Sequence, residues 1–177
     1  MNKRVSLIAV LLILVIATPL VAKTQSESLA PFWTIGLNME EIDESIFAPY
    51  KLTLVNIWAT FCPPCLQEMP ALGELYRELA DQGVGMIGIV TDVFDRNERV
   101  FQANLNTASI IVEKTKANYP HLLLSEDLYN LRLKNSQAVP ETFFVDSRGK
   151  IVGETYFGAK NKAAWKKVIE STLKLVE

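Results

Sequence analysis

The stretch that decides the fold is LTLVNIWATFCPPCLQEMP, residues 52–70, which holds both cysteines of the 177-residue chain. Its first part, residues 52–59, is apolar at nearly every position, and such a run predicts a β-strand that is buried on both faces. A helix is expected to begin just after Cys62, because Pro63 and Pro64 suit a first turn, where an N–H has no intrahelical partner. The cysteines are therefore predicted to lie where a buried strand gives way to a helix.

The spacing of Cys62 and Cys65 alone leaves three interpretations open. A zinc site requires about four ligands, and the chain offers two cysteines and one histidine, His121, which is distant in sequence. A structural disulfide can persist outside the cytoplasm, although so short a loop loses little chain entropy when it is closed. The third interpretation is a redox pair.

The redox interpretation uses every local feature of the segment. Cys62 would lie at a helix N-terminus, where free N–H groups and the helix dipole stabilise a thiolate. Cys65, one turn further into the helix, would be more buried and would serve as the resolving thiol. Thiol–disulfide exchange needs such a pair of unequal cysteines, so the residues favour this interpretation and no metal is expected.

The N-terminal residues have a different composition from the rest. Lys3 and Arg4 precede an almost unbroken apolar run over residues 5–22, which is typical of an export signal and close to the roughly 20 residues that span a bilayer. We expect residues 1–22 to be a signal peptide or an uncleaved membrane anchor, and residues 23–30 to be a linker. The domain would then be extracytoplasmic, in a bacterial cell envelope or secreted.

The remaining residues, 31–177, suit one globular domain. Hydrophobic residues make up 49% of the chain, enough for a sizeable core, and the net charge of −2 gives no electrostatic reason to expect nucleic acid as a partner. Strand and helix patterns alternate and end in a hairpin and a helix, which predicts an α/β fold with a central mixed sheet covered on both faces. The expected strands are residues 32–35, 40–42, 52–59, 85–91, 121–124, 142–145 and 150–156, and the expected later helices are residues 98–116, 127–134 and 161–176.

Two motifs resemble a known family. WATFCPPCLQEMPAL, residues 58–72, resembles the active-site segment of the membrane-tethered, thioredoxin-like oxidoreductases of the TlpA/ResA/DsbE type. The second motif, AVPETFFVDSRGKIV at residues 138–152, resembles their cis-proline loop and the hairpin that follows it. The resemblance implies a thioredoxin-like fold with an N-terminal β extension and an inserted helix at residues 98–116. One departure is Phe61, where the family often has a second tryptophan.

The resemblance also assigns roles to residues. Cys62 and Cys65 would be the redox pair, and Glu68 a partly buried acid that moves protons to and from Cys65. Pro140 would be a cis-proline that faces the disulfide. The expected partner-binding residues are Trp58, which packs under the site, Pro63, Pro64, Val139, Pro140 and Glu141.

The predicted function is reduction of specific disulfides in partner proteins, with no cofactor other than the Cys62–Cys65 disulfide. Apocytochrome c, a methionine sulfoxide reductase and another envelope protein are the candidate partners, and a membrane protein of the DsbD/CcdA type would supply electrons. One alternative is a binding or chaperone-like module on a thioredoxin scaffold with a structural disulfide. Another is a peroxiredoxin-like peroxidase, because Thr60 lies two residues before Cys62.

Overall fold

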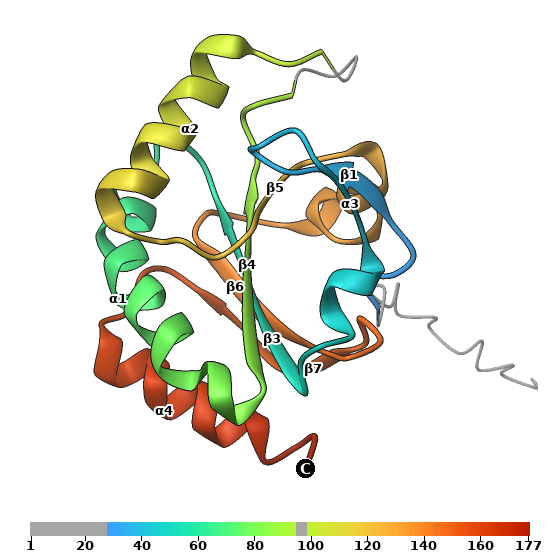
Figure 1. Ribbon diagram of the computed structural model, residues 1–177, viewed down its shortest axis with the longest axis vertical. Helices are drawn as coiled ribbons and strands as arrows, with labels where there is room; N and C mark the ends of the chain where they lie inside the picture. The colour runs from blue at the N-terminus through green and yellow to red at the C-terminus, as the bar shows by residue number, and fades with distance from the viewer. Residues whose placement is uncertain (1–27, 95–98) are drawn as a thin grey trace, which may run out of the picture.

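The computed structural model describes residues 28–94 and 99–177, and in this part of the chain the strands form a two-stranded and a five-stranded sheet (Figure 1). The small sheet pairs β1 with β2, and the large one has the strand order β5–β4–β3–β6–β7. The strands are β1 (Trp33–Ile35), β2 (Glu41–Asp43), β3 (Leu52–Trp58), β4 (Val84–Val90), β5 (His121–Leu123), β6 (Glu141–Asp146) and β7 (Ile151–Phe157).

The directions of the central strands decide which loops meet at one edge of the large sheet. Strands β3, β4 and β5 run parallel, whereas β6 runs antiparallel to β3. Every residue of β3 and β4 is buried, as expected for strands that are covered on both faces. Because β6 runs the opposite way, it begins at the edge where β3 ends, so Pro140 and Cys62 lie at the same edge of the sheet.

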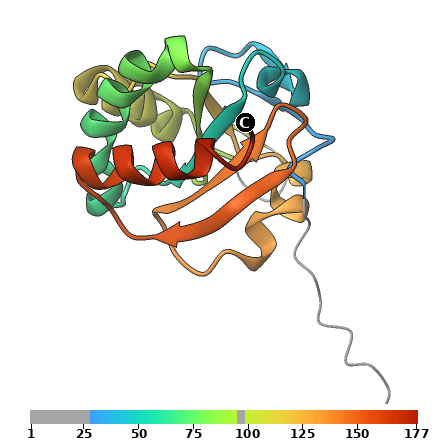
Figure 2. The same cartoon turned by 90° about the horizontal axis from the view of Figure 1, so that it is seen from below.

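The helices form two layers around the sheet. They are α1 (Pro63–Leu79), α2 (Gln102–Thr115), α3 (Glu126–Leu131) and α4 (Lys162–Leu173), with single 3-10 turns at η1 (Glu44–Phe47), η2 (Ala80–Gln82) and η3 (Leu133–Asn135). Figures 1 and 2 show α1, α2 and α4 on one face, and α3 with the β1–β2 extension on the other. Two clusters of buried side chains follow these faces, and the cluster under α1 includes both cysteines.

The observed architecture confirms the predicted mixed α/β sheet, and most predicted element bounds differ from the observed ones by only a few residues. The inserted helix is shorter than predicted, because it begins at Gln102 and ends at Thr115, where Lys116 adopts a left-handed conformation with φ of 55°. Helix α1 ends at Leu79, and the turn η2 then leads to Gly83, whose φ of 81° suits glycine.

The predicted linker over residues 23–30 requires a correction at its end. Leu29 is completely buried in the cluster on the α3 face, and its backbone N–H donates to the carbonyl of Gly149 at 2.8 Å. Residues 28–30 therefore belong to the fold, because an apolar side chain at position 29 completes the core. The predicted signal or anchor, residues 1–22, lies outside the described residues. Among the helices of the described ranges, none is both long and apolar enough to cross a bilayer.

Candidate redox site

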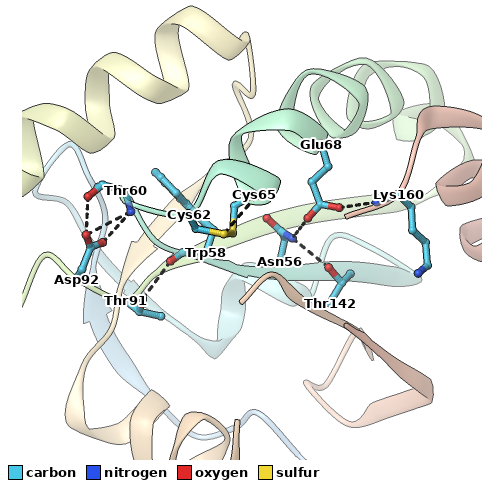
Figure 3. The surroundings of a disulfide bond; sticks show 10 residues. All are labelled: Asn56, Trp58, Thr60, Cys62, Cys65, Glu68, Thr91, Asp92, Thr142 and Lys160. Atoms are coloured by element: carbon cyan, nitrogen blue, oxygen red, sulfur yellow. Dashed lines mark hydrogen bonds between the residues drawn. A yellow bond between two sulfur atoms is a disulfide. The ribbon is translucent and has the colours of Figure 1, made fainter. Parts of the chain in front are cut away.

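Cys62 and Cys65 form a disulfide at the start of α1, with their Cα atoms 5.4 Å apart (Figure 3). Cys62 is the N-cap residue of the helix, and its Sγ accepts a hydrogen bond from the backbone N–H of Cys65 at 3.3 Å. Cys62 is 5% exposed and Cys65 is not exposed at all. The order of exposure is the predicted one, although Cys62 is far more covered than a freely exposed thiol would be.

The turn that precedes Cys62 is fixed to the end of β4. Thr60 donates to the Asp92 carboxylate through its backbone N–H at 3.1 Å and through its hydroxyl at 2.5 Å, and the N–H of Thr91 donates to the carbonyl of Trp58 at 3.0 Å (Figure 3). Asn104 of α2 donates to the Asp92 carbonyl at 2.6 Å. The Thr60 hydroxyl is thus bound to Asp92, which gives no support to a peroxidase-like role for it.

The peptide bond between Val139 and Pro140 is cis, as the sequence resemblance implied. The carbonyl of Pro140 accepts a hydrogen bond from Gly158 at 2.9 Å, which ties the loop to the end of β7. Val139 is half-buried against the cluster that contains both cysteines, whereas Pro63 and Pro64 are exposed. Pro63, Pro64 and the exposed part of Val139 therefore form an accessible apolar surface next to the disulfide, whereas Pro140 is buried.

Glu68 is a buried acid on α1, one turn beyond Cys65. Its carboxylate accepts hydrogen bonds from Asn56 Nδ2 at 2.9 Å, Trp165 Nε1 at 2.9 Å and the backbone N–H of Lys160 at 3.1 Å. Burial raises the pKa of Glu68 above its ordinary value, and these hydrogen bonds oppose the rise without cancelling it. Glu68 is therefore buried more completely than the partly buried acid that was predicted, its pKa is raised, and its catalytic role stays a prediction.

The raised pKa of Glu68 should appear in the pH dependence of stability. The folded protein holds this proton more tightly than the unfolded chain does, so the stability linked to Glu68 is greatest below its ordinary pKa of 4.5. It is lost as pH rises through the folded-state pKa. Urea unfolding over a pH series should show this decline in the native protein and a weaker decline in Glu68→Gln. An equal decline in both proteins would mean that Glu68 is not the group responsible.

Trp58 and His121 form a buried pair beneath the site. The Trp58 indole N–H donates to His121 Nδ1 at 3.1 Å, so His121 Nε2 carries the proton and donates to the Ala117 carbonyl at 2.9 Å. Burial lowers the pKa of His121 to about 4, which keeps the ring neutral. Both nitrogens are thus engaged within the fold, and among the described residues no group of three or more His, Cys, Asp or Glu side chains could hold a metal ion.

Three predicted partner-binding residues require correction, because Trp58, Pro140 and Glu141 are all buried. Trp58 is completely buried, so it supports the site from below, as the sequence indicated, and its side chain is not available to a partner. Glu141 is also completely buried, on the face of the sheet opposite α1, and its Oε1 accepts from Arg132 Nη2 at 2.5 Å. The reason is register: Glu141 lies opposite Ile57, whose side chain belongs to the α3-side cluster.

Several residues of the site were not identified from the sequence. Asn56 is a polar residue in a mostly apolar strand, and this was a usable signal, because a buried polar group needs hydrogen-bond partners. Asp92 directly follows a buried strand, which is also a usable signal. No sequence signal pointed to a role for Trp165 at the site, because its spacing indicated only the apolar face of a helix.

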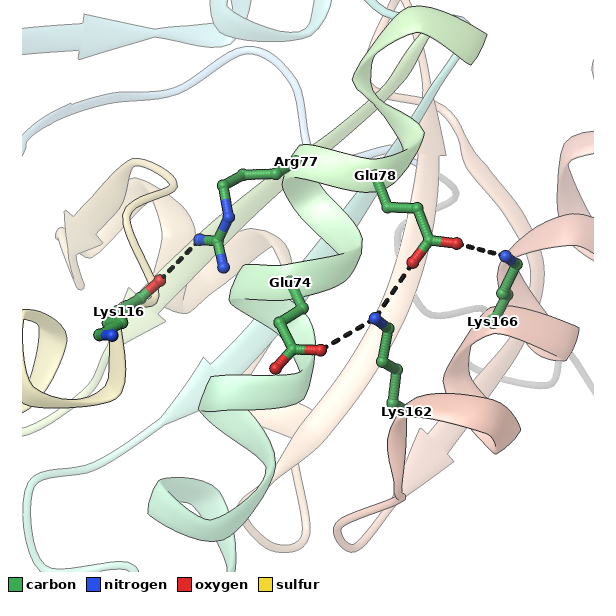
Figure 4. A network of polar contacts seen from close by, with 6 residues as sticks. All are labelled: Glu74, Arg77, Glu78, Lys116, Lys162 and Lys166. Carbon is green, nitrogen blue, oxygen red and sulfur yellow. Dashed lines mark hydrogen bonds and ion pairs between the residues drawn. The ribbon is translucent and has the colours of Figure 1, made fainter.

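Helix α4 is held against α1 by exposed ion pairs (Figure 4). Lys162 pairs with Glu74 at 2.8 Å and with Glu78 at 3.2 Å, and Lys166 also pairs with Glu78. Exposed pairs contribute little to stability individually. They do join the helix that carries Glu68 to the helix that carries Trp165.

A disulfide at the N-terminus of a helix after a central parallel strand, with a cis-proline at the same sheet edge, defines a thioredoxin-like fold. Residues 29–153 match the AhpC/TSA family, and the chain belongs to this family. The resemblance to ResA- and DsbE-like proteins is likewise confirmed by relatives of those names.

Two relatives and one solved structure are similar to this chain at low to moderate sequence identity. The DsbE thiol:disulfide interchange protein of Pasteurella multocida is 33% identical over 135 residues, which cover 75% of this chain and 65% of that protein. The thiol-disulfide oxidoreductase ResA of Halalkalibacterium halodurans is 28% identical over 102 residues, 58% of this chain and 52% of that protein. The chain thus spans between about half and two thirds of these relatives. A thioredoxin family thiol:disulfide interchange protein from Chlorobium tepidum has the same fold, with a TM-score of 0.67, 18% identity, and coverage of 86% of this chain and 99% of that one.

Proposed function

We propose that the protein is an extracytoplasmic thiol–disulfide oxidoreductase that reduces disulfides of specific partner proteins. The observation that carries this proposal is the asymmetry of the disulfide: Cys62 caps the helix and keeps slight exposure, whereas Cys65 is fully buried. Helix N–H groups stabilise a thiolate at the first position and burial disfavours one at the second. The names of two relatives, thiol-disulfide oxidoreductase and thiol:disulfide interchange protein, support the same activity.

The proposed reaction is a two-electron exchange. The Cys62 thiolate attacks one sulfur of the partner disulfide, a Cys62–partner disulfide forms, and the other partner sulfur leaves as a thiolate. Cys65 then gives its proton to Glu68 and attacks the Cys62 sulfur, which releases the second partner sulfur. The partner gains two electrons, and the Cys62–Cys65 disulfide forms. The accessible surface of Val139, Pro63 and Pro64 receives the partner chain.

Location and partners follow from the same proposal. Residues 1–22 direct export, either as a cleaved signal or as an anchor, so the partner is an apocytochrome c, a methionine sulfoxide reductase or another envelope protein. Because each cycle leaves the pair oxidised, a membrane electron donor of the DsbD/CcdA type returns it to the dithiol. The relative named DsbE supports a partner protein. The sequence of Pro140–Phe143 (PETF) resembles the cytochrome-maturation members, whereas residues 135–139 lack the glycine-rich segment typical of them.

The test is to trap the partner with a Cys65→Ser variant of the full chain, expressed in its own envelope. Without the resolving thiol, the Cys62–partner disulfide should accumulate and run as a larger, reductant-sensitive species. The matched control, Cys62→Ser with Cys65→Ser, should capture nothing. If Cys65→Ser captures no protein while the purified native protein consumes hydrogen peroxide with a thiol donor, the function is peroxidase rather than reductase.

A further inference from the structure

The side chain of Asn56, which contacts Glu68, contains a buried polar atom without a hydrogen-bond partner in the described part of the chain. It lies on β3 and is completely buried. Its Nδ2 donates to Glu68 Oε1 at 2.9 Å and to the Thr142 hydroxyl at 3.0 Å. Its Oδ1 is buried and has no hydrogen-bond partner among the described residues. Since a buried acceptor is normally paired, an unpaired one beside a reacting centre requires an explanation.

The orientation of the Asn56 amide is set by its neighbours. An ionised Glu68 carboxylate can only accept hydrogen bonds, so the Asn56 nitrogen must face it. Figure 3 shows the consequence: the amide lies between the disulfide and Glu68, with its nitrogen toward Glu68 and its oxygen on the side of the cysteines. The unpaired oxygen of Asn56 therefore points toward the Cys62–Cys65 disulfide.

Reduction of the disulfide creates a hydrogen-bond donor for the Oδ1 atom of Asn56. When the disulfide takes up two electrons and two protons, Cys65 becomes a buried thiol, and an S–H group is a weak hydrogen-bond donor. The oxidised sulfur has no hydrogen to donate. Leaving a buried acceptor unpaired destabilises the state in which it is unpaired, and here that state is the disulfide form.

We propose that Asn56 is a positioning residue whose Oδ1 accepts the Cys65 S–H in the reduced protein, while its Nδ2 keeps Glu68 in place. The Asn56 amide thereby favours the dithiol over the disulfide and makes the pair a weaker reductant than it would be without this contact. The inference rests on the proposed redox role of the pair, but it concerns an equilibrium of the isolated protein and involves no partner.

The experiment is to measure the equilibrium of the purified protein with glutathione in the native form and in Asn56→Leu. Loss of one hydrogen bond should lower the equilibrium constant for reduction about 3- to 10-fold, which makes the reduction potential about 14–30 mV more negative. Trp165→Phe is the matched control, because it removes another N–H donor from Glu68 and leaves the Asn56 oxygen untouched. It should shift the equilibrium much less.

Two results would overturn the proposal. One is an unchanged equilibrium in Asn56→Leu, and the other is an equal shift in Trp165→Phe, which would place the effect at Glu68. If Asn56→Leu does not fold, the proposal can still be tested on the native protein. Carbon NMR of the Asn56 side-chain carbonyl should show a shift on reduction that reports a new hydrogen bond, and an unmoved resonance would refute it. Failure to capture a partner with Cys65→Ser would refute the proposed function and leave these measurements unaffected.

Discussion

Glu68→Gln is expected to slow resolution of the mixed disulfide about 100-fold at neutral pH, because a positioned general acid or base typically contributes at least this factor. Glutamine has nearly the shape of the acid and cannot take the Cys65 proton. The attack of Cys62 on the partner should change little, since it proceeds from a thiolate stabilised at the helix N-terminus.

The two steps can be separated with a chromogenic aromatic disulfide as the substrate. Its first coloured thiolate is released when Cys62 attacks, and its second when Cys65 resolves the mixed disulfide. Only the second phase should slow in Glu68→Gln, and its pH profile should lose the titration of the acid. Glu74→Gln, on the same helix but exposed, is the control and should behave as the native protein. A second phase within twofold of the native rate in Glu68→Gln would remove Glu68 from the mechanism.

Arg132→Met is expected to lower the free energy of unfolding by about 3–5 kcal/mol, because it leaves the Glu141 carboxylate buried without its charged partner. Arg132 is 3% exposed and Glu141 is not exposed. The same guanidinium also donates to Thr155 at 2.8 Å and lies 4.6 Å from the centre of the Phe143 ring. One side chain therefore joins the segment after α3 to both strands that follow the cis-proline.

The measurement is urea unfolding of Arg132→Met, alone and with Glu141→Gln. Adding Glu141→Gln should restore a large part of the lost stability, since no unpaired charge then remains inside the fold. Arg148→Met is the matched control, because Arg148 pairs with Asp146 at 3.5 Å but is 83% exposed. If Arg132→Met costs no more stability than Arg148→Met, the buried pair does not stabilise the cis-proline segment.

The sequence was sufficient to predict the strand and the helix start that hold the two cysteines. A mainly apolar run and the two prolines that follow it predicted a buried strand and a helix start. Both signals are local, because they act within a few residues of each other. The cis-proline was predicted only through the family motif, because the identity of the residues at Val139 and Pro140 does not by itself favour the cis form.

The residues that were misplaced depend on contacts far apart in the chain. Glu141 was expected near a partner because it follows Pro140, but strand pairing opposite Ile57 directs it to the other face. Its partner Arg132 lies in a segment whose sequence pattern indicated only a short helix. Leu29 likewise looked like part of a linker, until the fold placed it against the Gly149 turn.

The contact between Trp165 and Glu68 joins residues that are 97 positions apart, and this has a consequence for biosynthesis. A chain that has emerged only as far as β6 already contains both cysteines, Asn56 and Pro140, but α4 has not yet been made. At that stage Glu68 lacks the hydrogen bonds that Lys160 and Trp165 donate in the complete fold. The full set of hydrogen bonds around Glu68 therefore forms only after the C-terminal helix α4 has docked.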